Sequence, residues 1–212
     1  MDNLIIRNEE ERDHRAVEEA TREAFWNLYV PGGDEHYLVH AIRESPDFIP
    51  ELAFVAELDG KIVGSIFFTK SYVLDDQGAK HDTITFGPVS VLPELHNNGI
   101  GAKLIHHAIG AAKVLGYRAI LIYGYEGYYR RFGFRHAKEY GVSNMEGKYP
   151  VAHLALELTP GGLADISGKA AESNVYEVDA QKAAAYDALF PAKEKKVMPS
   201  QQVFEKTASS FL

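Results

Sequence analysis

Two glycines, Gly99 and Gly101, stand in the stretch from His96 to Ala102 and are the first residues whose spacing suggests chemistry. They come shortly after an apolar, strand-like run over residues 86–92 and lead directly into a helical pattern. The first N–H groups of a helix have no partners inside it, and the helix dipole favours an anion at that end. Glycine lets the backbone approach a ligand closely. The stretch therefore predicts a phosphate cradle.

The same pattern has a simpler interpretation as a turn that caps a helix, because Gly-x-Gly pairs are common. No Gly-Lys-Ser/Thr follows, so the stretch is not a Walker A loop. No third glycine falls at the position that a dinucleotide fingerprint requires. The wider sequence context must decide between the two interpretations.

Three segments together resemble the GCN5-related N-acetyltransferase (GNAT) superfamily. They are residues 87–93, the turn His96-x-x-Gly99-x-Gly101-Ala102, and the motif Tyr129-x-x-x-Gly133-Phe134. In that family the turn has the form Gln/Arg-x-x-Gly-x-Gly/Ala and wraps the pyrophosphate of acetyl-CoA. This chain has His96 at the first position, which changes little because the family's contacts there are largely backbone amides.

The resemblance implies that acetyl-CoA, the acetyl donor, binds between two splayed parallel strands, expected over residues 81–92 and 119–123. The pantetheine arm would pair with exposed backbone there as a short pseudo-strand. An ordinary interior strand would satisfy the same strand residues equally well. The residues that the resemblance implies in cofactor binding are Val89, Ser90, Val91, His96, Asn97, Asn98, Gly99, Ile100, Gly101, Ala102 and Phe132.

Acetyl transfer to an amine requires that the amine lose a proton and that the departing thiolate gain one. Tyr129 matches the tyrosine that many members of the family aim at the CoA sulfur. A phenol with a pKa of about 10 stays protonated at neutral pH and can donate. A packing tyrosine is the alternative, and Tyr128 is the neighbour most easily confused with it. The base is left open between a water relay and five residues: Glu57, His81, Asp82, Glu126 and His153.

The composition excludes several other kinds of chemistry. The 212 residues include no cysteine, so disulfides, thiolate nucleophiles and Cys-based zinc sites are ruled out. His106 and His107 point about 100° apart on a helix, so they cannot form a metal site on one face, and no metal is expected. No apolar stretch approaches the roughly 18 residues of a membrane span, and no secretion signal is recognised at the start. A cytoplasmic location is therefore expected.

The formal net charge of −8 argues against a nucleic-acid partner, because phosphate binding generally needs a basic surface. It suits a cationic acceptor such as a protonated amine, with Glu57, Asp82 and Glu126 near the expected cleft strands. Solubility alone is the simpler explanation of the charge. The expected partner is a small-molecule or peptide amine, with neither nucleic acid nor membrane, and a homodimer is left open.

Hydrophobic periodicity and turn residues predict the order of the elements. Asp59-Gly60 indicates a hairpin turn, and Gly116 is expected to end the helix that follows the glycine turn. Residues 193–196 are interpreted as a solvated charge run. Strands are expected over residues 4–6, 52–58, 61–73, 81–92, 119–123, 151–158 and 173–178, and further helices over 12–28, from Asp34 onwards, over 126–132 and over 180–190.

The expected fold is α/β, with a GNAT-like mixed, largely antiparallel central sheet of about seven strands, a splayed parallel pair and flanking helices. Residues 3–158 are expected to form the acetyltransferase domain, and residues 159–212 a C-terminal extension of unknown role. By resemblance, the loop over residues 27–35, with Trp26, Tyr29 and Pro31, would form the wall of the acceptor site. The expected function is transfer of acetyl from acetyl-CoA to a primary amine. The alternative is a non-catalytic acyl-CoA-binding sensor or regulatory module.

Overall fold

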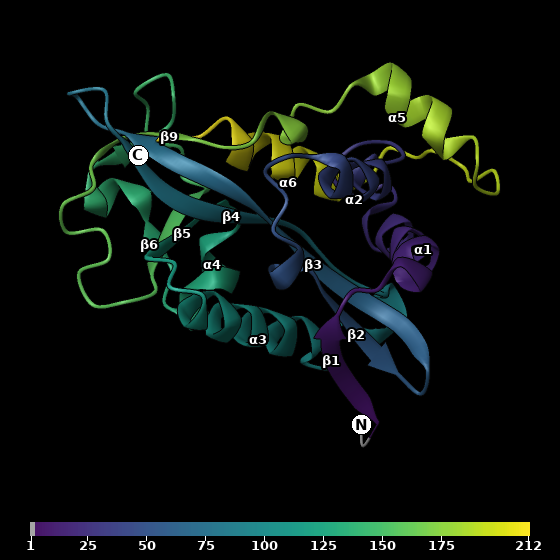
Figure 1. The fold of residues 1–212 in the computed structure, drawn as a ribbon. Helices are drawn as coiled ribbons and strands as arrows, with labels where there is room; N and C mark the ends of the chain where they lie inside the picture. Colours follow the sequence, from purple (N-terminus) through teal and green to yellow (C-terminus); the bar gives the residue numbers. More distant parts are fainter. Residues whose placement is uncertain (1–2) are drawn as a thin grey trace.

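The computed structural model describes residues 3–212, in which a nine-stranded mixed sheet carries the site (Figure 1). The strand order is β1-β2-β3-β4-β5-β8-β6, and β9 pairs with both β3 and β7. The strands are β1 Leu4–Asn8, β2 Phe54–Leu58, β3 Lys61–Leu74, β4 Lys80–Val91, β5 Ala119–Tyr123, β6 Arg135–His136, β7 Val142–Ser143, β8 His153–Glu157 and β9 Gly168–Ala171. The α-helices are α1 His14–Phe25, α2 Glu35–Glu44, α3 Ile100–Val114, α4 Glu126–Tyr129, α5 Ala180–Asp187 and α6 Pro199–Ala208.

Strands β1 to β4 form an antiparallel meander, and its turns follow from local sequence. Asp59 and Gly60, between β2 and β3, both have positive φ, as the predicted tight hairpin requires. After α3 the chain returns as β5, which lies parallel to β4. Within the described residues the two strands pair at one position, Ile84 with Ile120, and separate beyond it. The separation opens the sheet next to the glycine turn.

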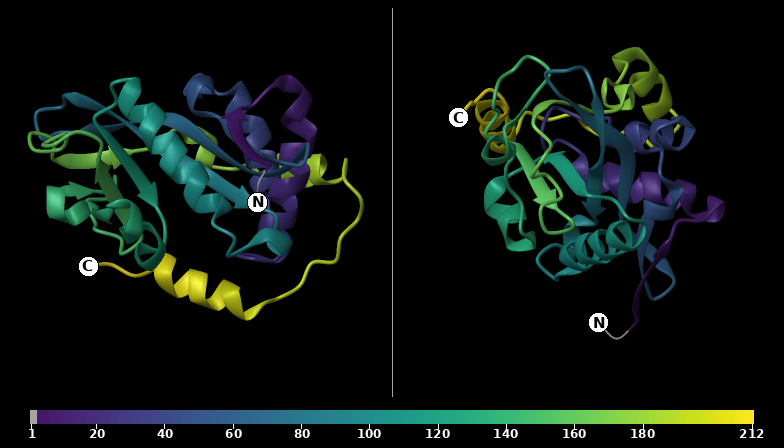
Figure 2. Two further views of the ribbon diagram at one scale, coloured as in Figure 1. Left: turned by 90° about the horizontal axis from the view of Figure 1, so that it is seen from below. Right: turned by 60° about the vertical axis from the view of Figure 1, so that its left-hand side comes forward.

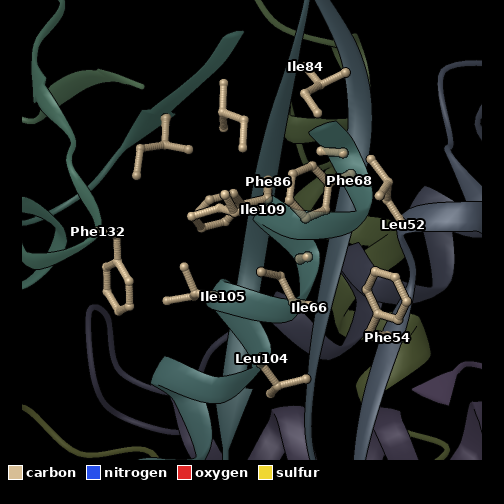
Figure 3. Packing of buried hydrophobic residues seen from close by; sticks show 14 of the residues in the cluster. Leu52, Phe54, Ile66, Phe68, Ile84, Phe86, Leu104, Ile105, Ile109 and Phe132 are labelled. Carbon is tan, nitrogen blue, oxygen red and sulfur yellow. The ribbon is translucent and has the colours of Figure 1, made fainter. Parts of the chain in front are cut away.

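Helix α3 covers one face of the sheet, and α1 and α2 cover the other (Figures 1 and 2). Between α3 and the sheet lies the main core, in which Leu104, Ile105 and Ile109 of α3 pack with Phe68 and Phe86 (Figure 3). These helix positions recur at the spacing predicted for one buried face. Removing this apolar surface from water fixes α3, and with it the turn that precedes it.

A smaller core lies beneath α1 and α2. Val17 of α1 and Val39 of α2 pack against Phe67, and all three side chains are fully buried. The expected first helix is shorter than predicted, since α1 ends at Phe25 and Asn27 has a φ of 62°. That positive φ cannot continue a right-handed helix, so the chain turns here toward the α1–α2 loop.

The strand predicted over residues 173–178 is wrong. A 3₁₀ turn occupies Asn174–Tyr176, and the strand is β9, a few residues earlier. Gly168 at its start has a φ of 139°, and a Cβ placed there would lie 2.1 Å from the Leu74 carbonyl oxygen. Only glycine lets the chain come so close to β3. The sheet consequently contains more strands than the expected seven.

Residues 159–212 extend across the molecule. Helix α5 is held to α1 by a 2.7 Å ion pair between Asp187 and the buried Arg22. An extended segment then passes around the edge of the molecule and leads to α6 (Figure 2). In the predicted charge run, the Glu194 carbonyl accepts a 2.9 Å hydrogen bond from the Trp26 indole, so its backbone is docked. None of the helices in residues 3–212 is long and apolar enough to cross a membrane.

Candidate active site

The glycine turn forms the N-terminus of α3. Gly99 is the N-cap residue, with a φ of 78°, and its carbonyl accepts the first helical hydrogen bond from the Lys103 N–H. The N–H groups at positions 100–102 therefore precede the first helical donor and point off the helix end. The His96 ring donates from Nε2 to the Val91 carbonyl at 2.9 Å, which ties the turn to the end of β4. This contact gives the unusual histidine a positioning role in the turn.

A cleft of about 610 Å³ begins at this helix end and reaches the point where β4 and β5 separate. Three elements meet around it: the end of β4 with the turn, the end of β5, and α4. Its lining consists of Tyr29, Val89, Val91, Leu95, His96, Asn97, Gly99, Ile100, Gly101, Ala102, Tyr123, Gly124, Tyr125, Tyr128, Tyr129 and Arg131.

Most of the residues expected to bind the cofactor line this cleft, but Ser90, Asn98 and Phe132 do not. Side chains alternate along a strand, so Ser90 points to the opposite face from Val89 and Val91. Its buried hydroxyl lies 3.0 Å from that of Ser65. Asn98 donates from its side chain to the Leu95 carbonyl, and Phe132 is part of the main core. Their predicted roles in binding stay predictions.

Tyr129 lines the cleft beside Gly124, which directly follows β5. Its ring packs so tightly on Gly124 that a Cβ there would lie 2.4 Å from ring carbon Cε2. The rings of Phe86 and Phe134 lie 5.8 and 5.7 Å away. Burial raises the pKa of the Tyr129 phenol, because the apolar surroundings disfavour its charged form. The hydroxyl therefore stays protonated at neutral pH.

Tyr128 occupies a different part of the cleft. Its hydroxyl lies 3.2 Å from the position that a Cβ of Gly101 would take, beside the first turn of α3. The Arg131 guanidinium lies over the Tyr128 ring at 4.7 Å. The cleft therefore has a cation in its lining in addition to the N-terminus of α3. No motif in the sequence singled out Arg131.

None of the five residues considered as bases lines this cleft. His153 is buried behind the Tyr123 ring, with ring centroids 4.8 Å apart, and burial lowers its pKa to about 4. The acidic residues expected near the cleft strands are likewise absent from its lining. The other four candidates are engaged or exposed elsewhere: Glu57 pairs with Arg7, His81 with Asp75, and Glu126 with His136, while Asp82 is exposed.

Glu172, a carboxylate that the sequence did not indicate, is also outside the cleft lining, but it lies close enough to the cleft residue Tyr123 to affect its pKa. Glu172 accepts a 3.3 Å hydrogen bond from the Thr85 hydroxyl, and Thr85 directly follows the last residue of β4 that pairs with β5. Partial desolvation of the carboxylate raises the pKa of Glu172 to about 7, although the residue as a whole is exposed. Its charge in turn contributes to a raised pKa of Tyr123, a cleft residue. Glu172 belongs to the C-terminal extension, so only the fold brings it here.

Of the residues expected to form the wall of the acceptor site, Tyr29 in the α1–α2 loop lines the cleft. Close to that loop lies Glu35, the first residue of α2, with one carboxylate oxygen buried and without a hydrogen-bond partner. Burial raises the pKa of Glu35 to about 7. In the described part of the chain, no group of three or more His, Asp or Glu residues could hold a metal ion.

Residues 17–134, which contain the turn and the Tyr129 motif, match the model of the Acetyltransferase (GNAT) family. The chain belongs to this family. The expected family and fold are thereby confirmed.

Known proteins show the same similarity. Over 114 residues the chain is 29% identical to the uncharacterized N-acetyltransferase YjhQ of Escherichia coli (strain K12), a match that spans 54% of this chain and 61% of that relative. The fold matches the GNAT family N-acetyltransferase YhbS of E. coli, solved in complex with CoA, with a TM-score of 0.74, 22% identity, and 83% and 93% coverage of the two chains. A GNAT family acetyltransferase from Brucella melitensis in complex with acetyl-CoA matches with a TM-score of 0.65 and 29% identity, covering 82% and 98%.

Proposed function

We propose that this protein transfers the acetyl group of acetyl-CoA to a primary amine of a small molecule or peptide. One observation carries the proposal: a single cleft has the open N-terminus of α3 at one end and the protonated phenol of Tyr129 at the other. Membership of the GNAT family supports it, as do the CoA and acetyl-CoA complexes of similar structures.

The residues of the cleft suit the parts of the donor. The N–H groups of α3 residues 100–102, with Arg131 nearby, would bind its phosphates. Val89 and Val91 lie where β4 has parted from β5, and their backbone would pair with the amides of the pantetheine arm. Acetyl-CoA would supply the activated acetyl group. Holding it against an amine accounts for much of the expected rate, because positioning alone contributes several kcal/mol.

Two residues of the chain would carry out the two proton transfers that the reaction needs. The C–N bond forms as the C–S bond breaks, the amine gives up a proton, and the sulfur takes one. Glu172 has a pKa of about 7 and is assigned as the base that accepts the amine proton, because half of it is ionised at neutral pH. Tyr129 is assigned as the acid that donates to the sulfur.

The direct test is to measure CoA thiol release from acetyl-CoA in the presence of a panel of primary amines. Amine-dependent release supports the proposal. Binding of acetyl-CoA without release for any amine supports the non-catalytic sensor instead. The cytoplasmic location, the homodimer and the division at residue 158 stay predictions.

A further inference from the structure

A second chamber of about 810 Å³ adjoins the donor cleft. The two spaces share four lining residues: Tyr29, Tyr123, Gly124 and Tyr125. The chamber therefore opens into the cleft next to the end of β5. Its remaining lining comes from the segment before β8, which contributes Glu146, and from the C-terminal segment, which contributes Val203, Phe204 and Phe211.

Helix α6 lies against this chamber and is fixed at its N-terminal end. The Phe204 ring stacks on Tyr29 with centroids 4.5 Å apart. The Gln201 amide donates to the Asn27 carbonyl at 3.0 Å, and the Lys196 N–H donates to the Asn27 side chain at 2.9 Å. These contacts attach α6 to the α1–α2 loop that the sequence indicated as the acceptor wall.

The C-terminus of the chain is attached to the segment before β8. The Leu212 N–H donates to the Tyr149 carbonyl at 2.8 Å, and the Val151 N–H donates to the Ser210 carbonyl at 3.0 Å. The C-terminal segment therefore contacts both the α1–α2 loop and the segment before β8, and it forms one wall of the chamber. This places the C-terminal extension next to the cleft.

The chamber is apolar in character. Glu146 is the one charged residue among those that line it, and its carboxylate is paired with Lys148 at 2.7 Å. Apolar side chains of its lining remain open to solvent: Val203 is 66% exposed, Phe204 43% and Phe211 50%. Covering such surface is favourable, and the lining offers little to hold a second charged group on a ligand.

We infer that this chamber binds the acetyl acceptor, and that the acceptor is a primary amine on an apolar aliphatic or aromatic body. The body would lie under α6, and the amine would point past Tyr123 toward Tyr129 and Glu172. The inference rests on the proposed acetyltransferase function and specifies its substrate class. It replaces the electrostatic selection expected from the net charge with selection by an apolar surface.

The test compares heptylamine with 2-(2-methoxyethoxy)ethylamine, a primary amine with equally many heavy atoms but two ether oxygens in its chain. We expect kcat/KM to favour heptylamine tenfold or more. Val203→Gln places a polar group on the chamber wall from an exposed position, so it leaves the fold intact. It should reduce the preference at least fivefold. Val114→Gln is the matched control, because Val114 is 88% exposed at the end of α3 and lies outside the chamber.

Equal kcat/KM values for the two amines, or a preference that Val203→Gln leaves unchanged, would overturn the chamber assignment while the acetyltransferase function stands. Absence of CoA release with every amine is a different result, because it overturns the proposed function and this inference together. A thermal shift with acetyl-CoA, measured on each variant, shows that the donor site is intact in both.

Discussion

Replacing Glu172 by glutamine removes the proposed base and keeps the shape of the side chain and its ability to accept from Thr85. Desolvation of its carboxylate raises the pKa of Glu172 to about 7. A carboxylate with that pKa is about 90% ionised at pH 8, half ionised at pH 7 and about 1% ionised at pH 5. A general base acts only when it is deprotonated, so its contribution is present above pH 7 and is lost as the pH falls through 7.

The measured quantity is the ratio of kcat/KM for the wild type to that for Glu172→Gln, across pH 5 to 8 with one amine. Ionisation of the amine itself affects both proteins equally and cancels in the ratio. General base catalysis typically contributes 10²–10⁴-fold, so the ratio should lie in that range at pH 8. It should fall about tenfold per pH unit below pH 7.

Glu177→Gln is the matched control, because Glu177 is an exposed carboxylate of the same segment. It should leave the profile unchanged. A ratio that does not vary with pH would refute the assignment, since loss of a merely structural carboxylate lowers activity without removing a titration near pH 7. The thermal shift with acetyl-CoA should be the same in all three proteins.

Three further predictions test other parts of the site. Tyr129→Phe keeps the ring packing and removes the donor, so kcat should fall 10²–10⁴-fold with little change in acetyl-CoA affinity; an unchanged kcat in a chemistry-limited assay would make Tyr129 structural. Gly101→Glu places a carboxylate beside Tyr128 at the phosphate end and should abolish the stabilisation by acetyl-CoA, which for the wild type is about 2.7 kcal/mol at a hundredfold excess over Kd in thermal melts. Glu35 has its pKa raised to about 7 by burial, so folding disfavours its ionised form and the penalty grows as the pH rises from about 4.5 to 7. Glu35→Gln should therefore raise Tm at pH 8, by about 2–4 °C for each kcal/mol removed, and leave it nearly unchanged at pH 4; an equal effect at both pH values would contradict this.

The features of this protein that could be predicted from sequence depend on residues a few positions apart. Asp59-Gly60 determines a hairpin because both residues adopt positive φ. Gly99 begins α3, and the apolar spacing after it determines which face is buried. Gly133, with a φ of 94°, ends the 3₁₀ turn over Arg130–Phe132 that follows α4. The cleft at the N-terminus of α3 is built from such local features, and for this reason most of the residues expected to bind the cofactor line one cleft.

The orientation of Ser90 was also contained in the sequence. Alternation along a strand places it opposite Val89 and Val91, so all three side chains could not face one ligand. The lengths of helices were less well determined, because the positive φ of Asn27 reflects its contacts with a distant segment. Local propensity carries no information about such contacts.

The positions of Glu172 and of the proposed acceptor chamber depended on tertiary structure. Glu172 reaches Thr85 across 87 positions of the chain, and β9 lies beside β3 because Gly168 lets two backbones touch. The C-terminal segment borders the chamber through the contact of Phe204 in α6 with Tyr29 and through the hydrogen bond of Leu212 to Tyr149, contacts that no periodicity of the C-terminal sequence reveals. Sequence alone predicted the glycine turn proposed to bind the donor, because a helix N-terminus is a local structure. The proposed base and the proposed acceptor chamber form only after distant segments have packed together, because each is made of side chains that become neighbours through that packing.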